Sequence, residues 1–367
     1  MTSQTAANRL ENAFALRSTE LPTDMIGIFG EGFPEALLRA AGARLTCLHV
    51  APIDDDSNAG QAVSDCIEPF VDHAVQCFLH RFAMDSFRNL QAIIFCRDDT
   101  AALVAYQYAS ELRRLGLAPA TPQLILWNLV HAPHAHDFNM LQMKKLWQYL
   151  DLAPPVDSAL AATLTDERAR ANALAELSDG TGRIPASTAI KWRIAGRNMD
   201  GREHAQLISA ALATAPRPVG QSLRLGLIGA PITAVDLYQT IEQHGHIVCD
   251  LQPIAAAWPV PLPEIPGIAA FLQAAASDPA CARIVPPDRH TEMLLRRLTA
   301  ANCDAVICQL QPHDDVFGWD VPQISDYLHA NETPFINLGF IDPAPDDTEL
   351  TRIGALLAHE LRQRGLT

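Results

Sequence analysis

Short apolar strands alternate with helical segments along this chain, and this alternation most constrains its fold. Between residues 22 and 140, the expected strands are Met25–Phe29, Leu45–Val50, Leu90–Phe95 and Gln123–Val130. Helical periodicity or a glycine stop separates the strands. Strands that are joined through helices pair in parallel, so this half of the sequence predicts a parallel sheet covered by helices.

The same alternation returns in the second half, after a long segment without strand signals. Residues 141–217 are rich in Ala, Leu, Arg and Glu and indicate helices. Beyond them, the expected strands are Leu223–Ile228, Ile247–Cys249, Ala305–Leu310 and Pro334–Leu338. A helix that opens at Asp320 and continues through Leu328 is expected between the last two strands.

These patterns predict an α/β fold with two parallel-sheet domains of the Rossmann or flavodoxin type and a helical insert between them. A length of 367 residues fits two domains, each large enough for its own core. The expected divisions are a helical N-terminal arm at 1–21, a first α/β domain at 22–140, a helical linker region at 141–217 and a second α/β domain at 218–367.

Charge and hydropathy exclude several classes of function. The net charge of -15 argues against a general binder of nucleic acid or of anionic membranes, because phosphate-rich surfaces attract a positive excess. No apolar run approaches the roughly 18 residues that a membrane-spanning helix needs. The N-terminus lacks the basic and apolar regions of a secretion signal. We therefore expect a cytoplasmic protein without membrane contact.

The eight cysteines are scattered through the chain and form no Cys-x-x-Cys pair. In a cytoplasmic chain this scatter argues against a disulfide framework. Free cysteine is among the most frequently buried residue types. We therefore expect most of these cysteines to be small buried hydrophobic residues.

Acidic residues follow two of the expected strands. Asp98 and Asp99 come shortly after Leu90–Phe95, and His313 and Asp314 follow Ala305–Leu310. The carboxyl ends of parallel strands are where α/β proteins bind ligands, so both loops are candidate functional sites. Asp98 and Asp99 would also suit the N-terminal turn of the next helix, where carboxylates are favourable.

Several separated segments, in the right order, resemble the 2-hydroxyacyl-CoA dehydratase / benzoyl-CoA reductase subunit family, which includes the 2-hydroxyglutaryl-CoA dehydratase D-component. The first runs from a strand to Pro34-Glu35 and on to Ala-Ala-Gly, and the second is LQAIIFCRDDTAALVAYQYASELRRLG. The third carries Ile241-Glu242, Gly245 and Asp250, and the last runs from Asn302 to Asp342. Together the matching segments span roughly residues 22–345.

The resemblance implies a function in acyl-CoA chemistry. Family members bind acyl-CoA thioesters, assemble with a homologous subunit and receive one electron from an ATP-hydrolysing activator protein. The reaction is the loss of an unactivated hydroxyl, a lyase activity, or the reduction of an aromatic ring. On the same resemblance, Glu35 and Arg289 are candidate substrate-facing residues, and a [4Fe–4S] cluster is the expected cofactor.

In this chain, other residues stand at positions where the family has its cluster cysteines. Two of the cysteine positions fall on Asp98 or Asp99 and on Asp314, and Cys66 or Cys77 could occupy the third. A [4Fe–4S] cluster binds thiolates, whereas carboxylates are hard ligands suited to divalent cations. The resemblance therefore predicts a divergent member without a standard cluster of its own, the cluster being held by a partner chain.

Three alternatives remain open at this point. Cys66, Cys96 and Cys308 could converge from separate elements on a cluster in this chain. The chain could instead be a non-catalytic structural or substrate-holding paralogue. The third alternative is an enzyme on the same fold that uses nicotinamide, with Asp250 at a ribose hydroxyl, or a divalent metal, with His313 and Asp314 among its ligands.

Overall fold

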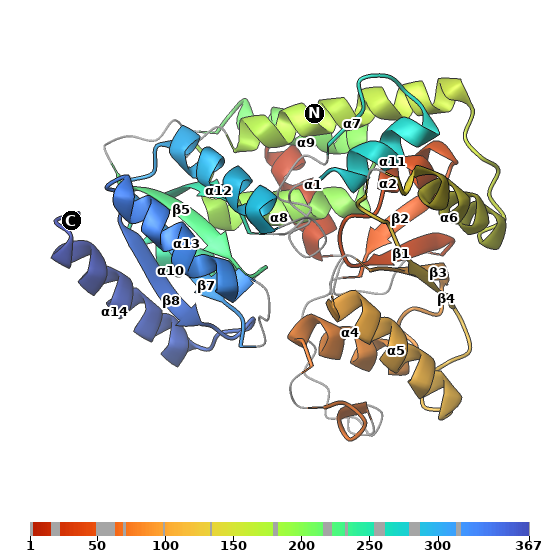
Figure 1. Cartoon of the computed structure of the whole chain (residues 1–367), viewed down its shortest axis with the longest axis horizontal. Coiled ribbons are helices and arrows are strands. Elements are labelled where there is room, and N and C mark those ends of the chain that lie inside the picture. The colour runs from red at the N-terminus through yellow and green to blue at the C-terminus, as the bar shows by residue number, and fades with distance from the viewer. Residues whose placement is uncertain are drawn as a thin grey trace.

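The described residues of the protein form two four-stranded sheets in which all strands are parallel (Figure 1). The computed structural model describes residues 3–15, 23–48, 63–68, 71–97, 100–132, 134–178, 183–215, 222–231, 234–252, 261–278, 287–312 and 317–366. The strand orders are β2-β1-β3-β4 and β6-β5-β7-β8. The predicted α/β class with two parallel sheets is confirmed, and both sheets follow the same topology.

The first sheet consists of β1 (Met25–Phe29), β2 (Arg44–Cys47), β3 (Leu90–Cys96) and β4 (Gln123–Trp127). Helices cover both of its faces, so β1 is buried along its whole length and reads as a continuous apolar run. The surrounding helices include α2 (Glu35–Ala40), α4 (His73–Ala83), α5 (Thr100–Arg114) and α6 (His136–Tyr149). The strand order reverses between β1 and β3, which is where such sheets bind ligands.

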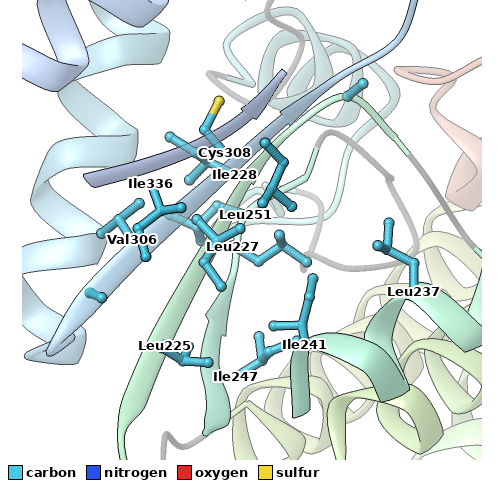
Figure 2. Close-up of a cluster of buried hydrophobic side chains, with 14 of the residues drawn as sticks. Leu225, Leu227, Ile228, Leu237, Ile241, Ile247, Leu251, Val306, Cys308 and Ile336 are labelled. Atoms are coloured by element: carbon cyan, nitrogen blue, oxygen red, sulfur yellow. The ribbon is translucent and has the colours of Figure 1, made fainter. Parts of the chain in front are cut away.

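The second sheet consists of β5 (Arg224–Gly229), β6 (His246–Asp250), β7 (Ala305–Leu310) and β8 (Phe335–Phe340). Its core includes Leu227, Val306, Cys308 and Ile336 (Figure 2). The neighbouring helices are α10 (Val235–Glu242), α12 (Pro287–Ala301), α13 (Phe317–Ala330) and α14 (Asp347–Gln363).

A packed helical body lies between the two sheets (Figure 1). It consists of α1 (Ser3–Ala15), α7 (Asp157–Leu177), α8 (Ala186–Ala195), η2 (Gly196–Asn198) and α9 (Gly201–Leu212). Ala6, Leu10 and Ala13 bury one face of α1 in a core shared with α8 and α9. The N-terminal helix is therefore part of this helical body and packs against the residues expected to form a linker.

Helix α11 (Ile268–Ala276) crosses back to the first sheet. Its Phe271, Leu272 and Ala275 are buried in the core of that sheet, and the helix contacts α6 and α2. Residues from the second half of the sequence thus form part of the hydrophobic core of the first sheet. An apolar helix face requires burial, but its spacing does not indicate which surface will bury it.

Two predicted helix boundaries differ from the structure. Helix α13 begins at Phe317, so the expected start at Asp320 is wrong, and Pro322 lies inside the helix. Helical periodicity in the sequence extends over Ile67–Phe87, but α4 occupies only His73–Ala83 of that range. The Asp72 side chain accepts a hydrogen bond from the backbone of Ala74 and caps the first turn of α4.

None of the helices in the described ranges combines the length and the apolar character that a bilayer-spanning helix needs.

Candidate functional site

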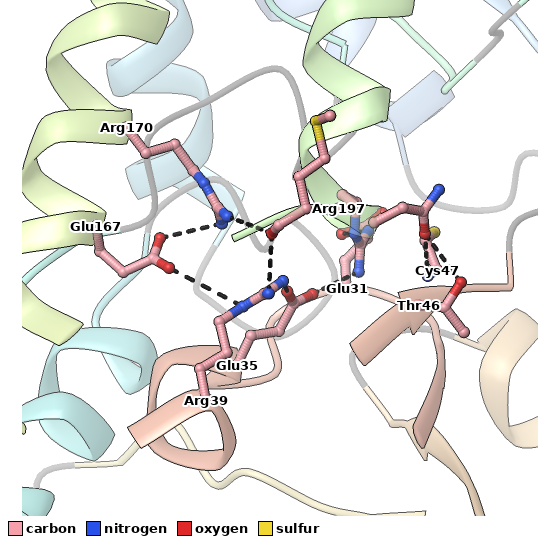
Figure 3. A network of polar contacts seen from close by, with 10 residues as sticks. Glu31, Glu35, Arg39, Thr46, Cys47, Glu167, Arg170 and Arg197 are labelled. Carbon is pink, nitrogen blue, oxygen red and sulfur yellow. Dashed lines mark hydrogen bonds and ion pairs between the residues drawn. The ribbon is translucent and has the colours of Figure 1, made fainter. Parts of the chain in front are cut away.

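A network of buried and half-buried charged side chains lies beside the carboxyl ends of β1 and β2 (Figure 3). It joins the loop after β1, helices α2 and α7, and the short η2 turn. The network includes three glutamates and three arginines, namely Glu31, Glu35, Glu167, Arg39, Arg170 and Arg197. The opposite charges balance, as buried ionised groups require.

Arg197 contacts two of the glutamates. Its Nη1 donates to both carboxylate oxygens of Glu31 at 2.9 Å, and its Nη2 donates to Oε1 of Glu35 at 2.9 Å. Burial alone would lower the pKa of Arg197, but nearby Cys47, Glu31, Glu35 and Cys96 raise it well above its usual value. The guanidinium therefore stays charged beside the thiols at the ends of β2 and β3.

Glu35 is held as a carboxylate. Burial alone would raise the pKa of Glu35, yet the charges of Arg197, Arg39 and Arg170 lower it below its ordinary value. Nη2 of Arg39 donates to Oε2 of Glu35 at 3.0 Å, so both carboxylate oxygens accept from a guanidinium. At neutral pH this side chain is ionised, which prevents it from acting as a general acid.

The η2 turn is fastened to the first sheet and to α7. The carbonyl of Met199 accepts from Arg39 Nη1 at 3.0 Å and from Arg170 Nη2 at 2.9 Å. On the sheet side, Oδ1 of Asn198 accepts from Oγ1 of Thr46 at 2.9 Å and from the backbone of Cys47 at 3.1 Å. These hydrogen bonds fix the backbone that carries Arg197.

A second polar network lies at the carboxyl ends of β5, β6 and β7. Oδ2 of Asp250 accepts from the Tyr238 hydroxyl at 2.8 Å and from Nη1 of Arg193 at 3.4 Å. Nε2 of Gln309 donates to the carbonyl of Ala230 at 2.7 Å. Burial and the Asp250 carboxylate raise the pKa of Tyr238 well above its usual value, so the phenol stays protonated and acts as a donor.

One helical segment connects the two networks. Arg193 lies in α8 and contacts the second sheet's Asp250, while Arg197 follows in η2 and contacts the first sheet's Glu31. Both arginine side chains are buried. The segment from Arg193 to Arg197 therefore ties the carboxyl edges of the two sheets together.

Neither of these two arginines was predicted from the sequence as a site residue. Arg193 and Arg197 are spaced four residues apart in IKWRIAGRN, within an apolar part of a helix. Charged residues are seldom fully buried unless they are paired. The position of Arg193 between Trp192 and Ile194 in the sequence could therefore have indicated a buried ion pair.

Of the two candidate substrate-facing residues, Glu35 belongs to the network and Arg289 lies apart from it. Arg289 is exposed in the first turn of α12. Burial lowers the pKa of His131, a hydrogen bond with the Ala276 carbonyl opposes this, and the charge of Arg289 lowers it further. The structure thus brings Arg289 near His131, in the loop after β4, whereas Glu35 lies in the network beside β1 and β2.

The candidate cluster cysteines lie in three different environments. Cys66 is exposed, Cys96 is buried at the end of β3 in the first core, and Cys308 is buried in the core of the second sheet (Figure 2). Across the residues that the structure describes, no group of three or more His, Cys, Asp or Glu side chains could hold a metal ion. These three cysteines are therefore not brought together and do not fit a [4Fe–4S] cluster, which binds converging thiolates.

Asp98, Asp99, His313 and Asp314 lie outside the described residues. Their assignment to cluster positions or to a metal site stays a prediction. Cys47, Cys77, Cys96 and Cys308 are buried, as expected for small hydrophobic residues.

Glu242 of α10 caps the N-terminus of α8. Its carboxylate accepts from the backbone of Ala186, and from the backbone at 3.3 Å and the hydroxyl at 2.7 Å of Ser187. A carboxylate that satisfies free N–H groups at a helix N-terminus stabilises a protein by about 1–2 kcal/mol. We expect Glu242→Gln to lower the free energy of unfolding by about that amount, measured by urea denaturation.

Glu111→Gln is the matched control, because Glu111 is an exposed partner of Arg114 on α5. Exposed ion pairs contribute about 0–1 kcal/mol, so this variant should unfold close to the wild-type midpoint. Equal effects of the two substitutions would contradict the capping role of Glu242.

A comparison with protein families gives one match over most of the chain. The family model described as 2-hydroxyglutaryl-CoA dehydratase, D-component, matches residues 32–357. The matched range includes seven of the eight strands in the described part of the chain and the helical segment that carries Arg193 and Arg197. A search of curated proteins gave no match.

Proposed function

Because the chain belongs to the 2-hydroxyglutaryl-CoA dehydratase D-component family, we propose that it is a subunit of a 2-hydroxyacyl-CoA dehydratase or benzoyl-CoA reductase-like system whose [4Fe–4S] cluster is held by a partner chain. The single observation that carries this proposal is the family match across residues 32–357. The substrate is an acyl-CoA thioester, the partner is a homologous subunit, and an ATP-hydrolysing activator supplies the electron.

The placement of the cysteines supports a cluster outside this chain. Cys96 and Cys308 belong to two separate hydrophobic cores, and Cys66 is exposed on another segment. In the sequence, Asp98 or Asp99 and Asp314 occupy the family's cysteine positions. Carboxylates are hard oxygen ligands and replace cluster thiolates poorly.

Within this chain, the proposed part of the reaction is holding the thioester at the carboxyl edges of the sheets, where parallel α/β sheets bind ligands. Arg193 and Arg197 fix these two edges relative to each other through Asp250 and Glu31. A low-potential electron must come from the partner's cofactor, because no amino-acid side chain supplies one.

A second candidate is a non-catalytic subunit that only holds substrate or stabilises the assembly. The state of Glu35 favours it, since both carboxylate oxygens are bound to arginines and the lowered pKa keeps the group ionised. A carboxylate held in this way positions helix α2 and has no proton to donate at neutral pH.

The nicotinamide alternative has less support. It required Asp250 at a ribose hydroxyl, and the Asp250 carboxylate instead accepts from Tyr238 and Arg193. The divalent-metal alternative rests on His313 and Asp314, which lie outside the described residues.

Anaerobic purification with iron and acid-labile sulfide analysis tests the proposal. We expect the chain alone to hold no stoichiometric iron or sulfide and to bind an acyl-CoA thioester in isothermal titration calorimetry. Together with its homologous subunit and the activator, it should support ATP-dependent turnover of the thioester. Stoichiometric iron and sulfide with a charge-transfer absorbance in the isolated chain would contradict a partner-held cluster.

A turnover assay and a metal analysis distinguish the remaining alternatives, the non-catalytic paralogue and the divalent-metal enzyme. Thioester binding without any turnover in the complete assembly would identify the non-catalytic paralogue. Stoichiometric zinc or magnesium that disappears in Asp314→Ala would identify the divalent-metal enzyme instead.

A further inference from the structure

Two cysteines that are far apart in the sequence meet on one face of the second sheet. Cys249 lies in β6 and is in register with Gly226 of the neighbouring strand β5. Cys303 lies between the end of α12 and the start of β7. Its Sγ is 3.2 Å from the point that a Cβ on Gly226 would occupy. Because Gly226 has no side chain, it leaves this space to the sulfur of Cys303.

The two cysteine side chains lie near each other, because Cys249 pairs with Gly226 and Sγ of Cys303 occupies the space beside Gly226; both side chains are only partly buried. Sγ of Cys249 donates to the carbonyl oxygen of Arg297, in helix α12 above the sheet, at 3.9 Å. The pair is thus assembled from β6 and the α12–β7 turn, over a glycine in β5. Partial exposure makes both sulfurs reachable by a small molecule.

The surroundings make the two thiols unequal. The neighbouring Cys249 thiol lowers the pKa of Cys303, burial opposes this, and the Arg224 guanidinium lowers it further. The neighbouring Cys303 thiol and burial raise the pKa of Cys249. Cys303 therefore ionises first, and a thiolate rather than a thiol is the nucleophile in disulfide chemistry.

We propose that Cys249 and Cys303 are a reversible disulfide site, with Cys303 as the attacking cysteine and Cys249 as the resolving one. The oxidant class is a low-molecular-weight disulfide such as oxidised glutathione. The site is independent of the acyl-CoA function proposed above, because neither cysteine belongs to the networks at the carboxyl edges of the sheets.

The exchange proceeds in two balanced steps. The Cys303 thiolate attacks one sulfur of the small disulfide, which breaks its S–S bond, forms a mixed disulfide and releases one thiolate. Cys249 then loses its proton to solvent and attacks Sγ of Cys303, which breaks the mixed disulfide and releases the second thiolate. The two protein thiols lose two electrons and two protons, and the small disulfide becomes two thiols.

The product would link β6 to the α12–β7 turn across β5. Asn302, the residue before Cys303, has a positive φ of 49°, and Cys303 itself lies outside both the helix and the strand. A sulfur carried on a turn can approach its partner without displacing a strand from the sheet. The cross-link would hold α12, the helix with Arg289 in its first turn, in one position against the sheet.

Peptide mapping of the full chain tests this site. The reduced wild-type protein is equilibrated with mixtures of reduced and oxidised glutathione, quenched with acid, alkylated after denaturation and digested. We expect a peptide pair linked through Cys249 and Cys303, the loss of these two alkylated thiols together, and recovery of both on reduction.

Three variants assign the roles of the two cysteines. Cys249→Ala should accumulate a stable mixed disulfide at Cys303 and, having lost the neighbouring thiol that lowers the pKa of Cys303, should show several-fold slower alkylation of Cys303 at neutral pH. Cys303→Ala should leave Cys249 largely unmodified. Cys66→Ser removes an exposed cysteine from another segment and should behave as the wild type.

Peptide mapping of the wild-type protein alone can contradict the proposal. The test therefore does not depend on whether the variants fold. A Cys303 that remains unmodified across the whole redox range would refute the site. A wild-type Cys303 that stops at the mixed disulfide would refute the resolving role of Cys249.

Discussion

Arg197→Met is expected to lower the free energy of unfolding by about 3–5 kcal/mol, the range for removing one partner of a buried ion pair. Three hydrogen bonds from this guanidinium, each 2.9 Å long, reach Glu31 and Glu35. Methionine fills part of the volume but leaves Glu31 without these two bonds and Glu35 with Arg39 as its remaining direct partner. The loss should be measured by urea denaturation followed by circular dichroism.

Arg114→Met is the control for Arg197→Met. Arg114 also pairs with a glutamate, Glu111, but its side chain is 69% exposed. Such a pair contributes about 0–1 kcal/mol, so the control should unfold near the wild-type midpoint. Adding Glu31→Gln to Arg197→Met should restore part of the lost stability, because it removes a carboxylate that has lost its two hydrogen bonds from Arg197. Similar losses in Arg197→Met and Arg114→Met would show that the buried network contributes little.

The pH dependence of the same variant provides an independent check. In the wild type the folded-state pKa of Glu35 is lowered, so its contribution to stability is present above the ordinary carboxyl pKa and is lost as the pH falls through the lowered value. Without Arg197, burial should instead favour the protonated carboxyl. The stability difference between wild type and Arg197→Met should therefore shrink as the pH falls from 7 towards about 4.

Gly229→Ala is expected to destabilise the second sheet by about 2–6 kcal/mol, the combined range of backbone strain and overpacking. Gly229 ends β5 with a φ of 120°, a conformation that L side chains rarely adopt. A Cβ at this position would lie 1.8 Å from the carbonyl oxygen of Gln309 on β7. Relief would require the separation of two paired strands, β5 and β7.

Gly339→Ala distinguishes backbone strain from the close approach of a Cβ to Gln309. Gly339 of β8 also has a positive φ, of 77°, but a Cβ there would meet nothing within 4 Å. It should carry the backbone strain alone, at about 1–3 kcal/mol. Urea denaturation and the soluble yield of both variants measure the difference. If Gly339→Ala were as damaging as Gly229→Ala, the close approach to Gln309 would not be the cause.

The strands could be predicted closely because each is a short apolar run with a clear end. Met25–Phe29 and Ala305–Leu310 have the same bounds in the sequence analysis and in the structure. Strands that are buried on both faces lack alternation and read as continuous hydrophobic segments. Glycine and polar residues at their ends then fix their length.

The candidate site could be predicted only in part. Glu35 was expected to face substrate because of the resemblance to the family, and the structure places it in a charged network. Its partner Arg197 comes from the helical body more than 150 residues later, and nothing in the local pattern connects the two. The pairing of Cys249 with Cys303 likewise depends on Gly226 lying between them in the sheet.

The sequence by itself determined the elements and their class, since hydrophobic periodicity and turn residues act over a few neighbouring positions. Only the tertiary structure decided which surfaces those elements cover. It placed α11 on the first sheet and set Arg193 and Arg197 between two sheet edges. The physical reason is that a periodic pattern states which face must be buried, whereas the partner of a buried charge or thiol depends on how distant segments pack.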